Sequence, residues 1–253
     1  MVSDRIRAMG ALHWIVLFAA ILAAWVALFA MSIPSDLRIA ARIYGADFWT
    51  SFCVVTPDAA GLMRVFAMWM LMSGAMMAPT ALPAFATYED IGRQTEINFS
   101  ALIAGYGAVW VGYSALAAVL QMWFFDMGLL NAVGDSQSLL FSAALLGVAG
   151  AYQFSPIKEA CLSKCRQPLT FFMGHFEEGP WRNGLRLGLV CLGCCWALML
   201  LAFVGGVMNL AFMGLATVIM ILEKLPEIGR YVTRPLGIIL LLSAASLALS
   251  AFI

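Results

Sequence analysis

Long apolar segments separated by short polar ones run along the whole chain. A helix needs about 20 residues, at about 1.5 Å each, to cross a hydrocarbon core of about 30 Å. Segments of roughly that length span residues 11–31, 62–85, 100–123, 137–155, 186–204, 207–222 and 236–253. In lipid, the backbone polar groups of such segments must be satisfied within a helix. The pattern predicts an all-α membrane protein, a polytopic bundle of about seven transmembrane helices forming a single domain over residues 1–253.

Composition agrees with this prediction and narrows the range of partners. Of the 253 residues, 63% are hydrophobic and 11% charged, which excludes an ordinary water-soluble domain with a charged shell. Lys plus Arg and Asp plus Glu number 14 each, so no basic field is available to hold nucleic acid. Arg5 and Arg7 precede the first apolar segment as in a signal peptide, but that segment exceeds the usual apolar length of about 7 to 15 residues. We therefore interpret it as a spanning helix within the lipid bilayer.

Breaks in the pattern predict local features. Pro79 and Pro83 predict a kink or an early end in the second segment. Gly205 and Gly206 separate the fifth and sixth segments and predict a tight antiparallel helical hairpin. Apolar and charged residues mix over 35–52, which predicts a short external amphipathic helix at the interface, with a plain loop as the alternative.

The cations predict an orientation if all seven segments span. Only three of the 14 Lys and Arg residues, Arg38, Arg42 and Arg64, then lie on the side opposite the N-terminus. Positive residues concentrate on the cytoplasmic side of membrane proteins, which predicts a cytoplasmic N-terminus and an external C-terminus. Residues 156–185 then form a cytoplasmic loop that contains cysteines.

Cysteines occur in two groups. Cys161 and Cys165 are four residues apart and share a helix face, which by itself is a weak sign of a site. Cys191, Cys194 and Cys195 contain the CxxC spacing that thiolate metal sites and dithiol redox pairs both use. A single free cysteine is usually a small buried apolar residue, but three within five positions favour chemistry over packing.

Methionines form a second candidate feature. Met68, Met72 and Met76 repeat every four residues and therefore stack along one helix face. Thioether sulfur selects Cu(I) and adds no charge within the membrane. We expect Met208 and Met213 to face this ladder. The alternative is that these residues simply fill gaps between helices.

Other residues near the apolar segments carry smaller predictions. Asn209 should have a hydrogen-bonding partner, because a polar group within lipid is costly. Glu223 should pair with Arg186 or help to ligate a metal ion. The glycine-rich stretches 105–107 and 147–150 predict close helix packing.

Three separated blocks of sequence resemble one family. Residues 69–83, 150–168 and 188–223 are similar, in this order, to the DUF2182 family of predicted metal-binding integral membrane proteins. The resemblance implies a multi-pass protein of the bacterial inner membrane that binds a metal through its Cys and Met residues.

Three functions are compatible with the sequence, which has no P-loop, HExxH motif or nucleophile elbow and therefore favours a role other than catalysis. In the first, the protein binds copper as Cu(I) for transport, delivery or homeostasis, with a metallochaperone or metalloenzyme as partner. In the second, Cys191 and Cys194 exchange electrons with Cys161 and Cys165 in a thiol-disulfide carrier. In the third, it is a non-catalytic assembly subunit of a membrane complex.

Overall fold

The computed structural model describes residues 12–32, 52, 54–92 and 98–252, and this part of the chain consists of helices joined by short connections. The elements are α2 (Leu12–Met31), α5 (Ala59–Ile91), α6 (Phe99–Asp126), α7 (Leu139–Tyr152), α8 (Pro156–Arg166), α9 (Pro168–Met173), the short 3-10 helix η3 (Phe176–Glu178), α10 (Pro180–Leu200), α11 (Ala202–Gly205), α12 (Leu210–Lys224) and α13 (Gly229–Ser250). The predicted all-α fold is confirmed for this part.

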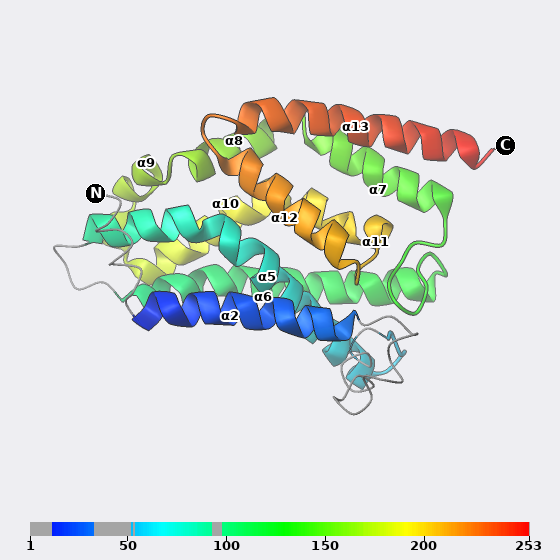
Figure 1. Ribbon diagram of the computed structural model, residues 1–253, viewed down its shortest axis with the longest axis horizontal. Helices are drawn as coiled ribbons and strands as arrows, with labels where there is room; N and C mark the ends of the chain where they lie inside the picture. The colour runs from blue at the N-terminus through cyan, green and yellow to red at the C-terminus, as the bar shows by residue number, and fades with distance from the viewer. Residues whose placement is uncertain (1–11, 33–51, 53, 93–97, 253) are drawn as a thin grey trace.

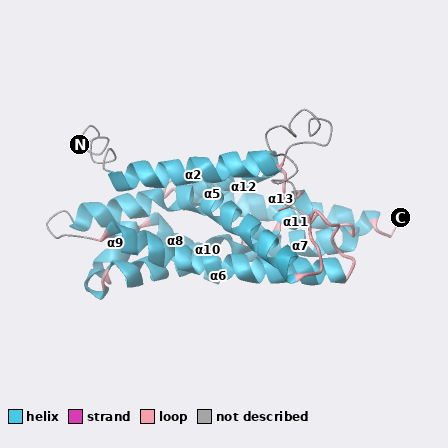
Figure 2. Cartoon of the chain, turned by 90° about the horizontal axis from the view of Figure 1, so that it is seen from below, coloured by secondary structure: helices cyan, strands magenta, loops and turns pink. Residues whose placement is uncertain are grey.

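The long helices lie side by side along one direction (Figures 1 and 2). In the packing, α10 lies against α6, α5 packs against both α2 and α6, and α13 packs against α7. The described chain starts with α2 at the end of the bundle where α9 lies, and α13 ends at the opposite end (Figure 1).

Five helical segments are long and apolar enough to cross a membrane. They are α2, α5, α6, α13 and the combined segment Pro180–Gly205. The pair α7 and α8 adds a sixth only if it counts as one span bent by 61°. All seven predicted segments contain a helix, but α12 has 15 residues and is therefore only about 22 Å long. The predicted number of seven spans is not confirmed.

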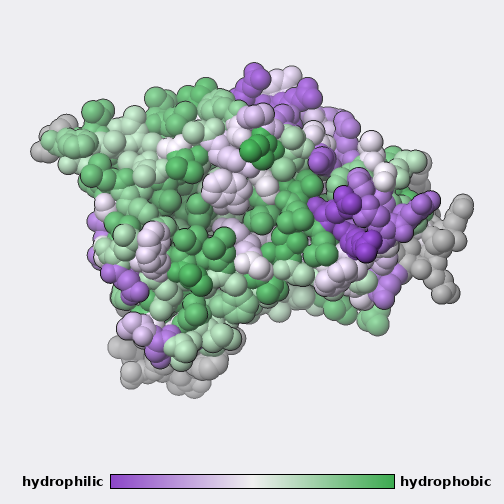
Figure 3. Space-filling model, turned by 180° about the vertical axis from the view of Figure 1, so that it is seen from behind, coloured by the Kyte–Doolittle hydropathy of each residue, from purple (hydrophilic) through white to green (hydrophobic). Residues whose placement is uncertain are grey.

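Large apolar side chains cover much of the outer surface (Figure 3). In α13, for example, Ile238, Ile239 and Leu242 are all more than half exposed. A water-soluble monomer rarely exposes contiguous apolar surface on this scale. The surface and the long apolar helices are compatible with a membrane protein.

Helix α5 continues through both prolines and bends along its course (Figure 1). Pro79 has no N–H for the carbonyl oxygen of Ala75, and Trp25 Nε1 of α2 donates to that oxygen instead, at 3.1 Å. A replaced hydrogen bond is what allows a proline inside a membrane helix. At the start of α5, the Thr56 hydroxyl and the Gly61 amide donate to Asp58, and they lower the pKa of this carboxyl group.

Two glycines bring α6 and α10 into backbone contact. A Cβ atom added to Gly184 would lie 2.1 Å from the carbonyl oxygen of Leu102, and one added to Gly105 would lie 2.3 Å from that of Trp181. Any side chain at either position would force the helices apart. The close packing expected of residues 105–107 is confirmed at Gly105.

The chain reverses between α11 and α12, but the predicted tight hairpin is not confirmed, because α12 makes few contacts with α10. Gly206 has a φ of 94°, which favours glycine. Asn209 then caps α12 by accepting from the Phe212 amide at 3.1 Å, and it donates to the Gly205 carbonyl at 3.0 Å. The predicted partner for Asn209 is therefore present. The helix α12 packs chiefly against α5 and α13.

Two of the predicted segments lie between the long apolar helices along the chain. The amphipathic helix expected over 35–52 lies outside the described residues except for Phe52. Residues 156–185, expected as a loop, are largely helical, because they contain α8, α9, η3 and the first turns of α10.

Candidate metal site

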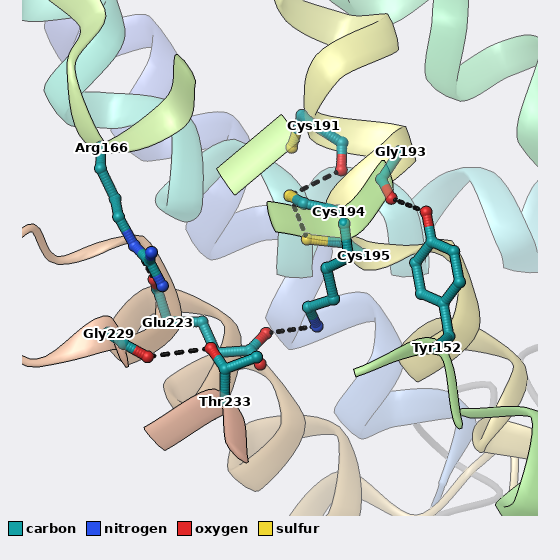
Figure 4. A network of polar contacts seen from close by, with 10 residues as sticks. Tyr152, Arg166, Cys191, Gly193, Cys194, Cys195, Glu223, Gly229 and Thr233 are labelled. Atoms are coloured by element: carbon teal, nitrogen blue, oxygen red, sulfur yellow. Dashed lines mark hydrogen bonds and ion pairs between the residues drawn. The ribbon is translucent and has the colours of Figure 1, made fainter. Parts of the chain in front are cut away.

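Three cysteine thiols meet on α10. Cys191, Cys194 and Cys195 are each 1% exposed, and their sulfur atoms all lie within 4.8 Å of one another. The Cys194 and Cys195 sulfurs are 3.2 Å apart, and the Cys194 thiol donates to the Cys191 carbonyl at 3.0 Å (Figure 4). Two sulfurs bound to one metal ion at about 2.3 Å each can be at most about 4.6 Å apart. The three thiols therefore need only small side-chain movements to share an ion.

The contact between α6 and α10 positions this thiol cluster. Cys191 lies seven residues, or about two turns, after Gly184 and so shares its helix face. Tyr106, next to Gly105 on α6, places its hydroxyl 3.3 Å from the Cys191 sulfur and donates to the Met77 carbonyl at 2.9 Å. The close contact of α6 and α10 at these glycines thus brings the Tyr106 hydroxyl next to Cys191.

A lysine from α12 completes the surroundings of Cys191. Lys224 Nζ donates to the Cys191 sulfur at 2.9 Å and to the Thr80 hydroxyl at 2.6 Å. A neighbouring ammonium group stabilises a cysteine as the thiolate, the form that ligates metals. Sequence reasoning did not select Lys224 or Tyr106 for the site. Lys224 could have been selected because it is a charged residue at the end of an apolar helix. Tyr106 gives no such signal, because a tyrosine in an apolar helix is not unusual.

A buried ion pair holds the end of α12 against α8. Lys158 Nζ and Glu223 Oε2 are 2.9 Å apart, and both side chains are 1% exposed. The Arg166 Nε also donates to the Glu223 carbonyl at 2.9 Å (Figure 4). The predicted pairing of Glu223 with Arg186 is wrong, because α8 folds over the end of α12 while Arg186 pairs with Glu178 at 2.8 Å. The ion pair fixes the backbone directly before Lys224.

The two cysteines of α8, Cys161 and Cys165, have different surroundings. Cys165 lies on α8, which packs against α10. It also lines a cavity of about 250 Å³ together with Cys191 and Lys224. Cys161 lies against the Cα atom of Gly193, where an added Cβ would be 2.6 Å from its sulfur. Of the described His, Cys, Asp and Glu residues, the group within 4.8 Å contains only the three cysteines of α10.

The predicted methionines belong to the same apolar core as the thiol cluster. Met68, Met72 and Met76 are buried along α5, and Met213 is buried on α12, which packs against α5. Met208 is only partly buried. Met76 lies one turn, about 6 Å of rise, before Thr80, the residue that contacts Lys224. The ladder therefore leads along α5 toward the thiol cluster.

Fold and site together define an all-helical protein with long apolar helices and a buried cluster of reduced cysteines beside a lysine. The family model of PpoB2, described as a copper chaperone, matches residues 66–247. The chain belongs to this family. The matched region contains all ten predicted site residues. A copper-related family is thereby confirmed, whereas the DUF2182 name is not. No curated protein and no solved structure shows detectable similarity to the chain.

Proposed function

We propose that the protein binds Cu(I) at the thiol cluster of α10 and passes it on within the bacterial inner membrane. The observation that carries the proposal is the convergence of three buried sulfurs within 4.8 Å in a member of a copper chaperone family. Thiolate and thioether are the soft ligands that select Cu(I). Copper is the cargo here, and a metallochaperone or metalloenzyme is its partner.

The charge of the site suits Cu(I). Two thiolates and one Cu(I) ion leave a net charge of about −1, and the ammonium of Lys224 beside Cys191 offsets it. An uncompensated buried charge costs several kcal/mol. Lys224 therefore makes the loaded site close to neutral.

The proposed route has two parts. The cavity beside Cys191 and Cys165 provides access from the side of α8 and α12. Met68, Met72 and Met76 then offer ligands along α5 that add no charge, and Met208 and Met213 extend this set from the α12 side.

The double variant Cys191→Ser and Cys194→Ser tests copper binding at the thiol cluster. We expect the parent protein, purified anaerobically in mild detergent, to hold about one copper per chain and the variant to lose it, because hydroxyl oxygen is a weak ligand for Cu(I). Copper and zinc per chain are measured by mass spectrometry. Cys161→Ser is the matched control and should retain copper, since Cys161 lies outside the cluster.

Other outcomes of this experiment contradict the proposal. Unchanged copper in the double variant, together with a Cys191–Cys194 disulfide recovered by thiol trapping in cells, would support the thiol-disulfide carrier instead. Zinc in place of copper would overturn the assignment of the ion.

The triple variant Met68→Leu, Met72→Leu and Met76→Leu tests the ladder. Leu has nearly the volume of Met but lacks sulfur, so each change should cost less than about 1.5 kcal/mol of stability. We expect normal amounts of folded protein, copper still bound at the thiol cluster, and loss of copper delivery in cells. Delivery at the parental rate would show that these methionines act only in packing.

A further inference from the structure

A second cavity, of about 970 Å³, lies between the α7–α8 junction and the start of α13. The junction contributes Gln153 and Glu159 to its wall, and α13 contributes Arg230, Tyr231 and Arg234. None of these residues belongs to the thiol cluster or the methionine ladder. The cavity is therefore a feature that the proposed copper function does not use.

The wall of this cavity is positively charged. Arg230 and Arg234 lie one turn apart on α13, and the one acidic wall residue, Glu159, is already paired with Arg166 at 3.2 Å. The first residues of α8 and α13 both border the cavity, and helix N-termini carry partial positive charge. Within the described part of the chain, neither Arg230 nor Arg234 forms an ion pair, so both guanidinium groups are available for an anion.

A residue with a buried amide borders the same cavity. Gln153 lines the cavity and is 5% exposed, and neither its Oε1 nor its Nε2 has a hydrogen-bond partner within the described structure. Leaving a buried polar group unpaired costs about 1–3 kcal/mol. A ligand with acceptor oxygens would satisfy the amide N–H groups.

We propose that this cavity binds the phosphate-bearing headgroup of an anionic lipid. Guanidinium groups recognise phosphate oxygens by paired hydrogen bonds. The mouth of the cavity also carries the exposed rings of Phe154 and Tyr231, and the exposed side chains of Ile238 and Leu242 continue along α13 beyond it. This apolar surface accommodates acyl chains, which a free phosphate ion would not need.

Lipid binding to the full chain in detergent tests the proposal. We expect native mass spectrometry to show phosphatidylglycerol bound more tightly than phosphatidylcholine, and Arg230→Gln with Arg234→Gln to weaken phosphatidylglycerol at least about tenfold. The double variant Lys164→Gln and Arg182→Gln removes the same charge from exposed positions outside the cavity wall and should bind like the parent. Equal loss in both double variants, or equal binding of the two lipids, overturns the site.

Two further arms separate the source of the anion from the site itself. Inorganic phosphate should bind at least about tenfold more weakly than phosphatidylglycerol. If phosphate and phosphatidylglycerol bind equally well, and both are lost with Arg230→Gln and Arg234→Gln, the ligand is a soluble phosphate compound and not a lipid.

Gln153→Glu places a negative charge in the cavity wall with little change of shape and should also weaken the binding of phosphatidylglycerol. If this variant unfolds at the same temperature as the parent and binds phosphatidylglycerol equally well, a headgroup beside Gln153 is contradicted.

Discussion

Lys224 is the residue on which the charge of the proposed copper site depends most. Its ammonium contacts the Cys191 sulfur, and its position follows from the buried pair of Lys158 and Glu223 one residue earlier. Replacing the lysine would leave the charge of the thiolates and the ion without its nearest compensation. A single side chain therefore links the packing of α8 on α12 to the chemistry of α10.

We expect Lys224→Gln to weaken Cu(I) binding at least about tenfold, which corresponds to about 1.4 kcal/mol, because the loaded site keeps a net buried charge. Competition against a calibrated Cu(I) chelator measures the affinity. Lys224→Arg preserves the charge and should recover most of the binding. Lys164→Gln removes an exposed lysine and should have no effect. Equal affinity of Lys224→Gln and the parent would remove the lysine from the site.

At the scale of helices, the glycines of α6 and α10 decide how the site is assembled. Gly105 touches the α10 backbone, whereas Gly107, two residues on, has nothing within 4 Å of an added Cβ. The two positions differ by about 200° around the helix, so only one can face α10. Gly150 allows a similar approach of α7 to α13, because a Cβ atom added to it would lie 3.0 Å from the Leu241 amide nitrogen. Small residues in the sequence predict close packing, and the partner helix determines which of them provides it.

Gly184→Ala should destabilise the protein by about 1–3 kcal/mol, because its Cβ would overlap the Leu102 carbonyl and push α6 from α10. We also expect weaker Cu(I) binding, since Tyr106 moves with α6. Thermal unfolding in detergent and chelator competition measure the two effects. Gly107→Ala adds the same methyl group in open space and serves as the control. A Gly184→Ala protein as stable as the control would show that the two helices separate at little cost.

At the scale of the whole molecule, the direction of the chain carries a prediction about topology. The described helices begin and end at opposite ends of the bundle (Figure 1), as an odd number of crossings requires. The helix α12 is too short to span a bilayer in an upright position unless its ends are covered or the membrane thins. The helix α7 has only 14 residues and counts as a span only together with α8, so α7 and α12 together decide the side on which the C-terminus lies.

We expect a reporter fused after Ile253 to be active only outside the cytoplasm, and one fused after Glu178 only inside it. The reason is that cations concentrate on the side of the N-terminus when all seven segments cross. Paired alkaline phosphatase and fluorescent protein fusions measure both positions. A cytoplasmic C-terminus would mean that one of the seven segments does not cross the membrane, and α7 and α12 are the shortest helices among them, with 14 and 15 residues.

The helical class, the apolar segments and the two groups of sulfur-containing residues could be predicted from the sequence. These features depend on local periodicity and composition, which can be determined without knowing the contacts between helices. The order of Cys191, Cys194 and Cys195 on one helix already places their side chains within a turn of one another. The prediction of copper as the bound ion rested on the same local grounds, namely the soft sulfur ligands.

The residues that surround these thiols could not be predicted, because they depend on how the helices pack. Lys224, Thr80 and Tyr106 come from three other helices, and their distances to Cys191 depend on how those helices cross. The pairing of Glu223 with Lys158 rather than Arg186 has the same origin, because α8 folds back over α12 at long range in the sequence. Contacts between distant segments depend on how closely helix backbones approach and on which buried charges pair. The local spacing of residues contains neither kind of information.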